Sequence, residues 1–519
     1  MSAAGTQGAQ PDAGVFAALF PAELRGSAGA QREFLCTPEG RRLSYAQVLG
    51  DSARLAHALR ASGIVPGDRV AVQVDKTPEA LLVYFAVLRA GAVYLPLNSA
   101  YTGAELEYFL RDAEPALLLA TSERRASLAA LCARVGVARL LTLEPGGQDS
   151  LLQAAAVQPV EFEDVARAPS DPAAILYTSG TTGRSKGAVL TQANLISNAR
   201  TLAACWRFSA RDRLLHALPI FHIHGLFVAV NVTLASGAAL LLLPRFDPAL
   251  VLHHLPDCSV LMGVPTFYVR LLREAALNHA VTAKVRLFVS GSAPLLAETF
   301  QAWQQRTGHT ILERYGMSET GMNCSNPYEG ARVPGSVGPP LPGVQVRITD
   351  PASGAPLPAG SIGMIEVRGP NVFAGYWRQP ELTREQLRSD GWFISGDLGR
   401  MDAGGYVYIV GRGKDLIISG GYNVYPREVE LQLDALPGVL ESAVIGLPHD
   451  DYGEAVTALV VALPGQTPSE QVLLRSLRER LAAYKLPKRI LFVSELPRNL
   501  MGKVQKAQLR ATHAALYAR

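Results

Sequence analysis

Apolar residues recur every three or four positions in two early segments, and each segment is followed by a short apolar run. The first pattern is typical of an amphipathic helix and the second of a buried strand. We therefore expect helices at residues 43–63 and 78–91 and strands at residues 68–74 and 92–98. Similar βαβ alternation continues to about residue 340. It predicts α/β layers built on largely parallel sheets.

The pattern changes twice in the second half of the chain. From Gly335 it consists of short strand-like runs with Pro/Gly turns, at 343–350, 363–369 and 405–412, which predict a small β subdomain. After Arg412, strands and helices alternate again over about 100 residues, an ordinary domain size. We place the domain boundary here, with an N-terminal domain at 1–414 and a C-terminal domain at 415–519.

Residues 225–243 contain no charged residue and are long enough to suggest a membrane span. Asn231, Thr233 and the Ala-Ser-Gly turn at 235–237 divide this stretch into two apolar pieces. We interpret the pieces as two buried elements of an α/β core, and we expect no membrane insertion.

The composition is that of a globular protein, with 519 residues, 48% hydrophobic residues and 18% charged residues. A net charge of +4 without any cluster of like charges argues against a nucleic-acid partner. The five cysteines are odd in number and widely spaced, which favours neither disulfides nor a zinc site. The first residues lack a signal peptide or transit peptide, so we expect a cytoplasmic protein.

The strongest candidate for chemistry is the segment 178–187, TSGTTGRSKG. Its glycines, serines and threonines can wrap main-chain N–H groups and hydroxyls around phosphate oxygens, and Lys186 adds a positive charge. The spacing is not that of a Walker A loop. Such a loop can also be a simple surface turn, but its density of hydroxyl groups favours phosphate binding.

Three further segments carry side chains suited to a nucleotide. Glu319, in YGMSET at 315–320, is suited to Mg²⁺, which takes only one or two protein ligands beside a triphosphate. Asp397 follows an apolar run, so we expect it at a strand end, where a carboxylate can bind ribose hydroxyls. Lys503 lies in a loop near the C-terminus. Each residue alone also fits a turn or a solvated charge; their joint order and spacing indicate a common site.

The motifs TSGTTGRSKG, PIFHIHG, GSAPL, YGMSET, SGD, GRGKDLIISGGYNVYP and PRNLMGK together resemble the adenylate-forming superfamily of acyl-CoA synthetases, luciferases and adenylation domains. The resemblance extends from about Leu43 to the C-terminus. Within the superfamily, ERYGMSETGMNCSNPYEG, VRGPNVFAGYWRQPE and LPRNLMGKVQK are most similar to malonyl-CoA synthetases. Ser318 and Ser395 stand where the family commonly has Thr, and both keep the hydroxyl.

The resemblance implies an α/β fold with a large N-terminal domain of two α/β subdomains plus a small β subdomain, and a small mobile α+β C-terminal domain. It implies an ATP-binding set: Thr178, Ser179, Thr181, Thr182 and Lys186 at the phosphates; Ser292, Ala293, Pro294, Tyr315, Gly316 and Met317 around adenine; Asp397 and Arg412 at the ribose. It also implies a catalytic set of Lys503, Glu319, Thr320 and His222, with Glu319 and Thr182 at the Mg²⁺ ion.

The implied reaction joins an acid to coenzyme A with ATP and Mg²⁺ through an acyl-AMP intermediate. A carboxylate approaches a polyanionic triphosphate poorly, so Lys503 and Mg²⁺ would stabilise the charge that develops at the α-phosphorus. A thiol then displaces AMP, with His222 between the acyl and thiol channels. Because the lysine is needed only in the first step, the C-terminal domain would rotate about Asp415 between the two steps.

We expect the acid pocket to include Arg270, Ser292, Ile223 and Met322. A guanidinium suits a second carboxylate, which it can bind through two parallel hydrogen bonds. The alternative is that Arg270 points outward from a helix surface. Ile223 stands where relatives often carry Thr, and its bulk disfavours malonates substituted at C2. His222 and His224 lack a third ligand and do not predict a metal site.

We expect malonate, ATP and CoA as substrates, and three alternatives remain open. Within the same superfamily, the chain could be a short- or medium-chain acyl-CoA synthetase, which is distinguished by whether Arg270 faces the pocket. It could instead load an acyl carrier protein in trans, since we expect no fused carrier domain after Lys503. From a different class, the phosphate loop could serve a phosphotransferase or a nucleotide-binding regulator, although Lys503 and Asp397 argue against a protein that only binds.

Overall fold

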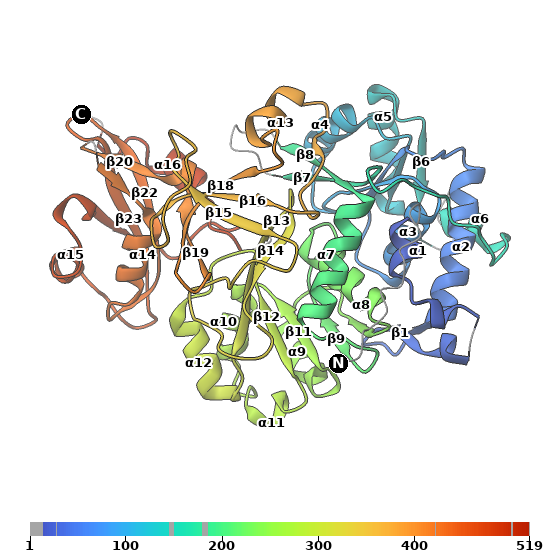
Figure 1. Cartoon of the computed structure of the whole chain (residues 1–519), viewed down its shortest axis with the longest axis horizontal. Helices are drawn as coiled ribbons and strands as arrows, with labels where there is room; N and C mark the ends of the chain where they lie inside the picture. Colours follow the sequence, from blue (N-terminus) through green and yellow to red (C-terminus); the bar gives the residue numbers. More distant parts are fainter. Residues whose placement is uncertain are drawn as a thin grey trace.

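The computed structural model describes residues 14–26, 28–144, 150–178, 185–420, 422–499 and 502–517. Two large sheets with helices around them form most of the molecule, and a smaller antiparallel sheet lies between them and the C-terminal domain (Figure 1). The C-terminal domain, drawn in orange and red, packs at one end of this assembly. The α/β fold that the sequence predicts is confirmed.

The first sheet has seven strands in the order β17-β8-β7-β4-β3-β5-β6. Its inner strands are parallel, whereas β8 runs antiparallel to β7 and β17 to β8. The strands are β3 (Arg69–Gln73), β4 (Val93–Pro96), β5 (Leu117–Ala120), β6 (Arg139–Thr142), β7 (Pro172–Thr178), β8 (Lys186–Thr191) and β17 (Gly375–Tyr376). The helices of this region are α1 (Val15–Leu19), α2 (Tyr45–Ala61), α3 (Pro78–Arg89), α4 (Gly103–Ala113), α5 (Arg125–Val135) and α6 (Leu151–Ala156).

The two predicted helices and two predicted strands correspond to α2, α3, β3 and β4. Helix α2 begins at a capping box in which the Ser44 hydroxyl accepts from the Gln47 N–H, while the Gln47 side chain accepts from the Ser44 N–H. Gly63 follows the helix with a φ of +85°, a conformation that favours glycine. Local signals therefore suffice to define these elements.

The second sheet has eight strands in the order β14-β13-β12-β11-β9-β10-β1-β2 and is parallel except for its two edge strands. The strands are β1 (Glu33–Cys36), β2 (Arg42–Ser44), β9 (Arg213–His216), β10 (Ala239–Leu242), β11 (Val260–Gly263), β12 (Leu287–Ser290), β13 (Ile311–Met317) and β14 (Gly321–Ser325). The helices are α7 (Gln192–Cys205), α8 (Asn231–Ala235), α9 (Pro248–His254), α10 (Pro265–Arg273), α11 (His279–Thr282) and α12 (Ala297–Thr307).

The uncharged stretch at 225–243 folds into a buried helical element followed by a buried strand, as the sequence predicts. A π-helical segment, η4 (His224–Val230), continues into α8, and β10 follows after a turn at Gly237. Nearly all of its apolar side chains are buried. Across the described ranges, we find no helix with both the length and the hydropathy that crossing a membrane requires.

The predicted small β subdomain is an antiparallel sheet of four strands, β15 (Gln345–Thr349), β16 (Gly363–Arg368), β18 (Phe393–Met401) and β19 (Val407–Arg412), with α13 (Pro380–Gln386) beside it. Asp397 lies inside β18, so our prediction of a strand end was wrong. The strand continues because Asp397 pairs with Arg412 of β19, and Gly396 accommodates the chain with a φ of +73°.

The C-terminal domain contains a sheet of five strands, β20 (Ile417–Ser419), β21 (Tyr422–Val424), β22 (Val439–His449), β23 (Gly453–Ala462) and β24 (Arg489–Phe492). Its helices are α14 (Pro426–Asp434), α15 (Glu470–Arg478) and α16 (Lys506–His513). Two apolar clusters form its own core, separate from the core that joins the two large sheets. A domain with its own core can change position without unfolding.

Candidate active site

The predicted catalytic lysine is held in a short turn that the C-terminal domain presses against α10. The Asn499 side-chain oxygen accepts a hydrogen bond from the Lys503 N–H at 3.0 Å. Gly502 has a φ of +75°, and a Cβ placed on it would lie 3.0 Å from the Thr266 side chain. Only glycine therefore fits this contact easily, and the contact brings Lys503 into the cleft between the domains.

Charged groups of the N-terminal domain surround Lys503. The side chain keeps access to solvent, but the protein around it lowers the pKa of Lys503 to about 8, first through loss of hydration and then through the nearby Arg412. Asp397 and Glu319 act in the opposite direction and favour the charged form. The structure thus brings together four residues that are far apart in the sequence.

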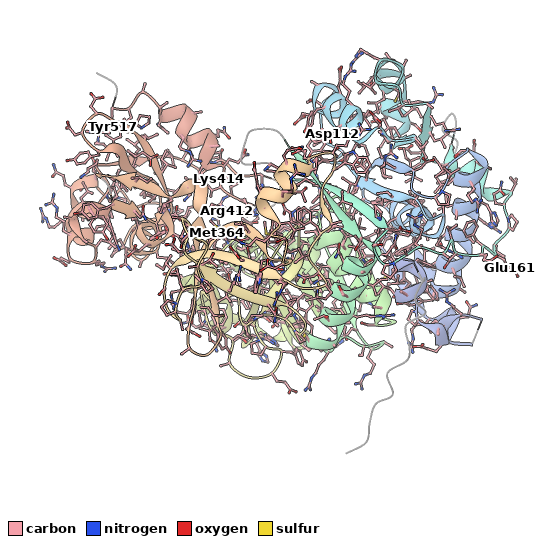
Figure 2. All side chains as sticks on the ribbon, turned by 45° about the horizontal axis from the view of Figure 1, so that its top comes forward. Asp112, Glu161, Met364, Arg412, Lys414 and Tyr517 are labelled. Atoms are coloured by element: carbon pink, nitrogen blue, oxygen red, sulfur yellow. The ribbon has the colours of Figure 1, made fainter. Side chains whose placement is uncertain are left out.

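Asp397 is the centre of a hydrogen-bonded cluster at the junction of the domains. Its Oδ2 accepts from the Tyr315 hydroxyl at 2.5 Å, and its Oδ1 accepts from Arg412 Nε at 2.8 Å. The Ser395 hydroxyl accepts from the Asp397 N–H and donates to Ile365. Figure 2 labels Arg412 and Lys414 where the chain passes into the C-terminal domain. The carboxylate is therefore fixed in position within reach of the cleft.

Glu319 lies in the turn between β13 and β14 and is 7% exposed. Its Oε1 accepts from the Tyr376 hydroxyl at 3.1 Å, and burial raises its pKa while Tyr376, Arg412 and Lys503 lower it. On the other side, the Lys186 ammonium lies 5.3 Å from the centre of the Tyr376 ring. Tyr376 thus connects the predicted Mg²⁺ ligand with the predicted phosphate-binding lysine.

Only the two ends of the predicted phosphate loop are described. Thr178 ends β7 and Lys186 begins β8, and the two residues are paired across these antiparallel strands. Ser179, Thr181 and Thr182 lie outside the described residues. The loop therefore joins two adjacent strands of the first sheet.

His222 and His224 are both neutral at physiological pH. Burial and the positive charges of Lys503 and Arg314 lower the pKa of His222 to about 3. Burial and Arg314 lower the pKa of His224 as well. Ser292 lies within 3.5 Å of His224 Nδ1 and has a φ of +73°, which is unusual for a residue other than glycine. A strained serine beside two neutral imidazoles is a feature of functional sites.

The remaining predicted residues fall in three places. Ala293 and the exposed Pro294 follow Ser292, whereas Gly316, Met317 and Thr320 lie near the β13–β14 turn, where Gly316 leaves room for the Met322 side chain. Asp415, the predicted hinge, lies in a short 3₁₀ turn and forms an ion pair with Arg510 at 2.9 Å. The structure thus connects the hinge residue with α16 of the same domain.

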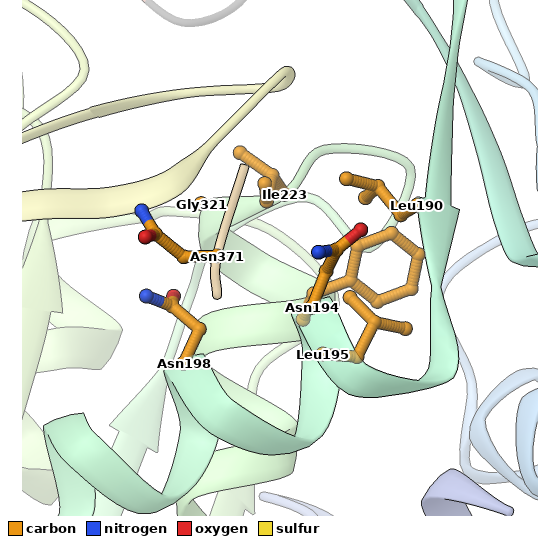
Figure 3. Close-up of a pocket in the computed structure, with 8 residues that line it drawn as sticks. Leu190, Asn194, Leu195, Asn198, Ile223, Gly321 and Asn371 are labelled. Atoms are coloured by element: carbon orange, nitrogen blue, oxygen red, sulfur yellow. The ribbon is translucent and has the colours of Figure 1, made fainter. Parts of the chain in front are cut away.

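Met322 and Ile223 are almost completely buried at 0% and 3% exposure, whereas Arg270 is exposed on α10. Arg270 lies four residues after Thr266, hence on the same helix face as the contact with the lysine turn. Ile223 lines a cavity of about 10 Å³, enough for one water molecule, together with Leu190, Asn194, Leu195, Asn198, Phe227, Gly321 and Asn371 (Figure 3). The space beyond Ile223 is therefore nearly filled.

Three kinds of site residue were not predicted from the sequence. Asn198 of α7 binds both the N–H and the carbonyl of Met322, and Asn371 donates to the Thr320 carbonyl. These amides fix the segment after Glu319. Tyr376 and the buried Arg314 were missed as well. Their aromatic and charged character was visible, but their position depends on strands and helices distant in sequence.

The site combines a lysine of the C-terminal domain with a carboxylate–arginine pair and a loop rich in hydroxyl groups, as nucleotide-dependent acid activation requires. Residues 24–377 match the model of the AMP-binding enzyme family, and residues 428–503 match the C-terminal domain of the same family. The chain belongs to this family and is an enzyme of the AMP-forming CoA ligase class.

Individual relatives are similar along most of the chain. A feruloyl-CoA synthase from an Amycolatopsis species is 39% identical over 91% of this chain and 94% of its own length. A malonate–CoA ligase from Arabidopsis thaliana is 36% identical over 86% of this chain and 78% of its own length. ATP-bound MatB from Rhodopseudomonas palustris is 54% identical over 98% of this chain and 100% of its own, with a TM-score of 0.94. The apo form of MatB gives a TM-score of 0.83, so the present structure is more similar to the ATP-bound form.

The lowered pKa of Lys503 predicts an alkaline loss of acyl-adenylate formation. We expect kcat/KM for ATP to fall as the pH rises through about 8, because the ammonium then loses its proton. An arginine keeps its charge to above pH ~12, so Lys503→Arg should remove this decline even where it lowers the rate. ATP–pyrophosphate exchange measures this step. A wild-type profile that stays flat up to about pH 9.5 would contradict the assignment.

Proposed function

We propose that the protein is a malonate–CoA ligase, which converts malonate, ATP and CoA into malonyl-CoA, AMP and pyrophosphate through malonyl-AMP. The observation that carries the proposal is the position of Lys503 beside Glu319, Asp397 and Arg412. Curated relatives named malonate–CoA ligases support the choice of acid.

The cleft is suited to the first half-reaction. Lys503 would bridge the attacking carboxylate and the α-phosphate, and its charge would stabilise the transition state. Asp397 would accept hydrogen bonds from the ribose hydroxyls through its free lone pairs, and Tyr315 would stack on the adenine. The loop from Thr178 to Lys186, with Ser179, Thr181 and Thr182, would hold the outer phosphates.

The chemistry of the donors is compatible with Mg²⁺. The Glu319 carboxylate accepts one hydrogen bond, from Tyr376, and has further lone pairs available. Among the described residues there is no group of three or more metal-ligating side chains, but Mg²⁺ beside a triphosphate needs only one or two. Glu319, with Thr182, would hold the ion, which would supply positive charge at the phosphate oxygens.

The second half-reaction requires Lys503 to leave the cleft. We propose that the C-terminal domain begins at Asp415 and rotates there. The separate core of this domain supports the idea, since rotation would leave that core intact. The neutral His222 would then lie between the acyl group and the incoming thiol.

Malonate is favoured over larger acids by the surroundings of Ile223. Ile223 is 3% exposed, and its bulk would limit the space beside the reacting acid. Arg270 on α10 would bind the distal carboxylate. Transfer to a carrier protein in trans and a cytoplasmic location also remain proposals.

A coupled assay of AMP release with CoA across malonate, methylmalonate, succinate, acetate, octanoate and ferulate tests the proposal. We expect the highest kcat/KM with malonate and a lower value with methylmalonate, because Ile223 crowds the C2 position. Pyrophosphate as the co-product would separate this reaction from phosphotransfer. Preference for octanoate or ferulate would disprove the choice of acid and leave the ligase class intact.

Lys503→Ala should abolish malonyl-AMP formation and largely preserve thioester formation from pre-formed malonyl-AMP. The loss of one charge contact made in the transition state commonly costs about 10²–10³ in rate. Single-turnover assays of each half-reaction measure the two effects. Equal damage to both would contradict the role of this lysine.

Asp415→Pro should preserve adenylation and impair thioester formation, because proline fixes φ near about −65° and restricts the rotation. Asp415→Ala is the control, since it removes the ion pair with Arg510 but leaves the backbone free. The same half-reaction assays apply. If the alanine variant behaves like the proline variant, the ion pair and not the backbone is responsible.

Arg270→Leu should raise the KM for malonate and leave the KM for ATP nearly unchanged. Arg270 is exposed in the free protein, so the effect requires that bound malonate buries the pair. Removal of one member of a charge pair buried in this way costs about 2–5 kcal/mol, which is about 30-fold to several thousand-fold in kcat/KM. The variant should accept butyrate better than the parent does, as butyrate has no distal charge. Malonate activity within about threefold of the parent would make Arg270 a surface residue without a role in binding.

A further inference from the structure

Glu313 is a buried carboxylate that its own domain satisfies only in part. It lies on β13 and is 5% exposed. Its Oε1 accepts a hydrogen bond from the Leu295 N–H at 3.1 Å, whereas its Oε2 is buried and makes no hydrogen bond within the described structure. Burial raises the pKa of Glu313 to about 7. A positive group near the free oxygen would stabilise the charged form of this carboxylate.

The positive group that acts on Glu313 comes from the C-terminal domain. Arg427, in the first turn of α14, lowers the pKa of Glu313. Helix α14 packs against β19, at the junction between the C-terminal domain and the antiparallel sheet (Figure 1). The two side chains attract each other across this junction without forming a hydrogen bond, so the attraction acts through space or through a bridging water molecule.

Arg427 is not fully engaged by the carboxylates of its own helix. Its guanidinium lies 3.8 Å from Glu430 and 3.7 Å from Asp434, and both distances are longer than a hydrogen bond. Each of these carboxylates has a closer partner. Glu430 accepts from the Lys506 ammonium at 2.5 Å, and Asp434 accepts from the Ser442 hydroxyl at 2.7 Å. The charge of Arg427 is therefore available to the neighbouring domain.

Carboxylates face one another across the same junction. Burial raises the pKa of Asp434 to about 7, and the negative charges of Glu430 and of Glu298, on α12 of the N-terminal domain, raise it further. Arg427 acts in the opposite direction. Without this arginine, α14 would bring negative charge toward both α12 and β13. Arg427 thus offsets a repulsion that would oppose the packing of the two domains.

The same contacts connect the junction to the lysine turn and to the nucleotide site. Lys506 begins α16 and follows Lys503 by three residues, and its bond to Glu430 joins α16 to α14. On the other side, Glu313 holds the N–H of Leu295, which directly follows the predicted adenine-binding segment. The position of α14 therefore bears on where the lysine turn lies relative to the nucleotide.

We propose that Arg427 is a positioning residue, which docks α14 beside the buried carboxylate of Glu313 in the domain arrangement that places Lys503 in the cleft. This inference rests on the two half-reactions and the rotation of the proposed function, and it does not depend on the choice of acid. Rotation would carry α14 away from β13, so the attraction stabilises only the arrangement for the first half-reaction. Arg427 acts on the reaction through the position of Lys503.

The test measures both half-reactions in Arg427→Met, which keeps much of the side-chain volume and removes the charge. Single-turnover assays at about pH 8, where Glu313 is mostly ionised, give the rate of acyl-AMP formation and the rate of thioester formation from pre-formed acyl-AMP, with the acid that the parent activates best. The ratio of the first rate to the second should fall about tenfold, which corresponds to about 1.4 kcal/mol. Arg427→Lys should restore part of the ratio, since a positive charge returns. An unchanged ratio in Arg427→Met, or no recovery in Arg427→Lys, would overturn the inference.

Glu313→Gln tests the other member of the pair and replaces Arg427→Met if that variant fails to fold. The amide keeps an oxygen for the Leu295 N–H and removes only the charge. The ratio should fall in this variant too. In the double variant it should fall no further than in the more affected single variant, because both changes remove one interaction. Losses that multiply in the double variant would show two independent effects and contradict the pairing.

Arg489→Met is the matched control, because Arg489 forms an ion pair with Glu470 at 3.3 Å within the C-terminal domain. The ratio should stay at the parent value in this variant. A similar fall there would reflect a general weakening of the domain and would overturn the inference. Lys503→Ala separates the two levels of the argument. Equal damage to both half-reactions in Lys503→Ala overturns the proposed mechanism together with this inference, whereas unequal damage there with an unchanged ratio in Arg427→Met overturns this inference alone.

Discussion

The packing of the Gly502–Lys503 turn against Thr266 is the contact on which the site depends. Asp397, Arg412 and Glu319 belong to the N-terminal domain, whereas Lys503 comes from the C-terminal domain. Gly502 permits the contact in two ways, through its positive φ and through the absence of a Cβ near Thr266. Without this turn, Asp397, Arg412 and Glu319 would form a binding site that lacks the cation assigned to the first reaction step.

The cleft gathers more positive than negative charge, and this excess of positive charge fits a polyanionic substrate. Lys503, Arg412 and Arg314 act on one another or on shared neighbours, and Asp397 and Glu319 provide negative charge in the same region. Asp415 also acts on Arg412, but its carboxylate is paired with Arg510. Burial lowers the pKa of both Arg314 and Lys503, and the nearby Arg412 lowers that of Lys503 further. A nucleotide triphosphate and a dicarboxylic acid would supply the missing negative charge.

Local sequence signals predicted the regular elements well, and the site only in part. Helix α2 and strand β4 follow from their periodicity and capping residues, and the antiparallel sheet follows from its turns. Asp397 was misplaced at a strand end because its position depends on pairing with Arg412, which the local pattern does not reveal. Arg314 was missed for a similar reason, since its burial on β13 beside Gly291 depends on strands that are distant in sequence.

The same electrostatics connect the chemistry to the movement of the C-terminal domain. Before the reaction, the negative charge of ATP would stabilise the ammonium of Lys503, which burial and Arg412 otherwise disfavour. Departure of pyrophosphate removes most of that negative charge, and the lysine then loses the interactions that offset its desolvation. The contact at Thr266 would then be one of the remaining restraints. In the mechanism that we propose, the C-terminal domain, which has its own core, would rotate about Asp415 once its contacts with the N-terminal domain are released, and this rotation would open the acyl-adenylate to the thiol.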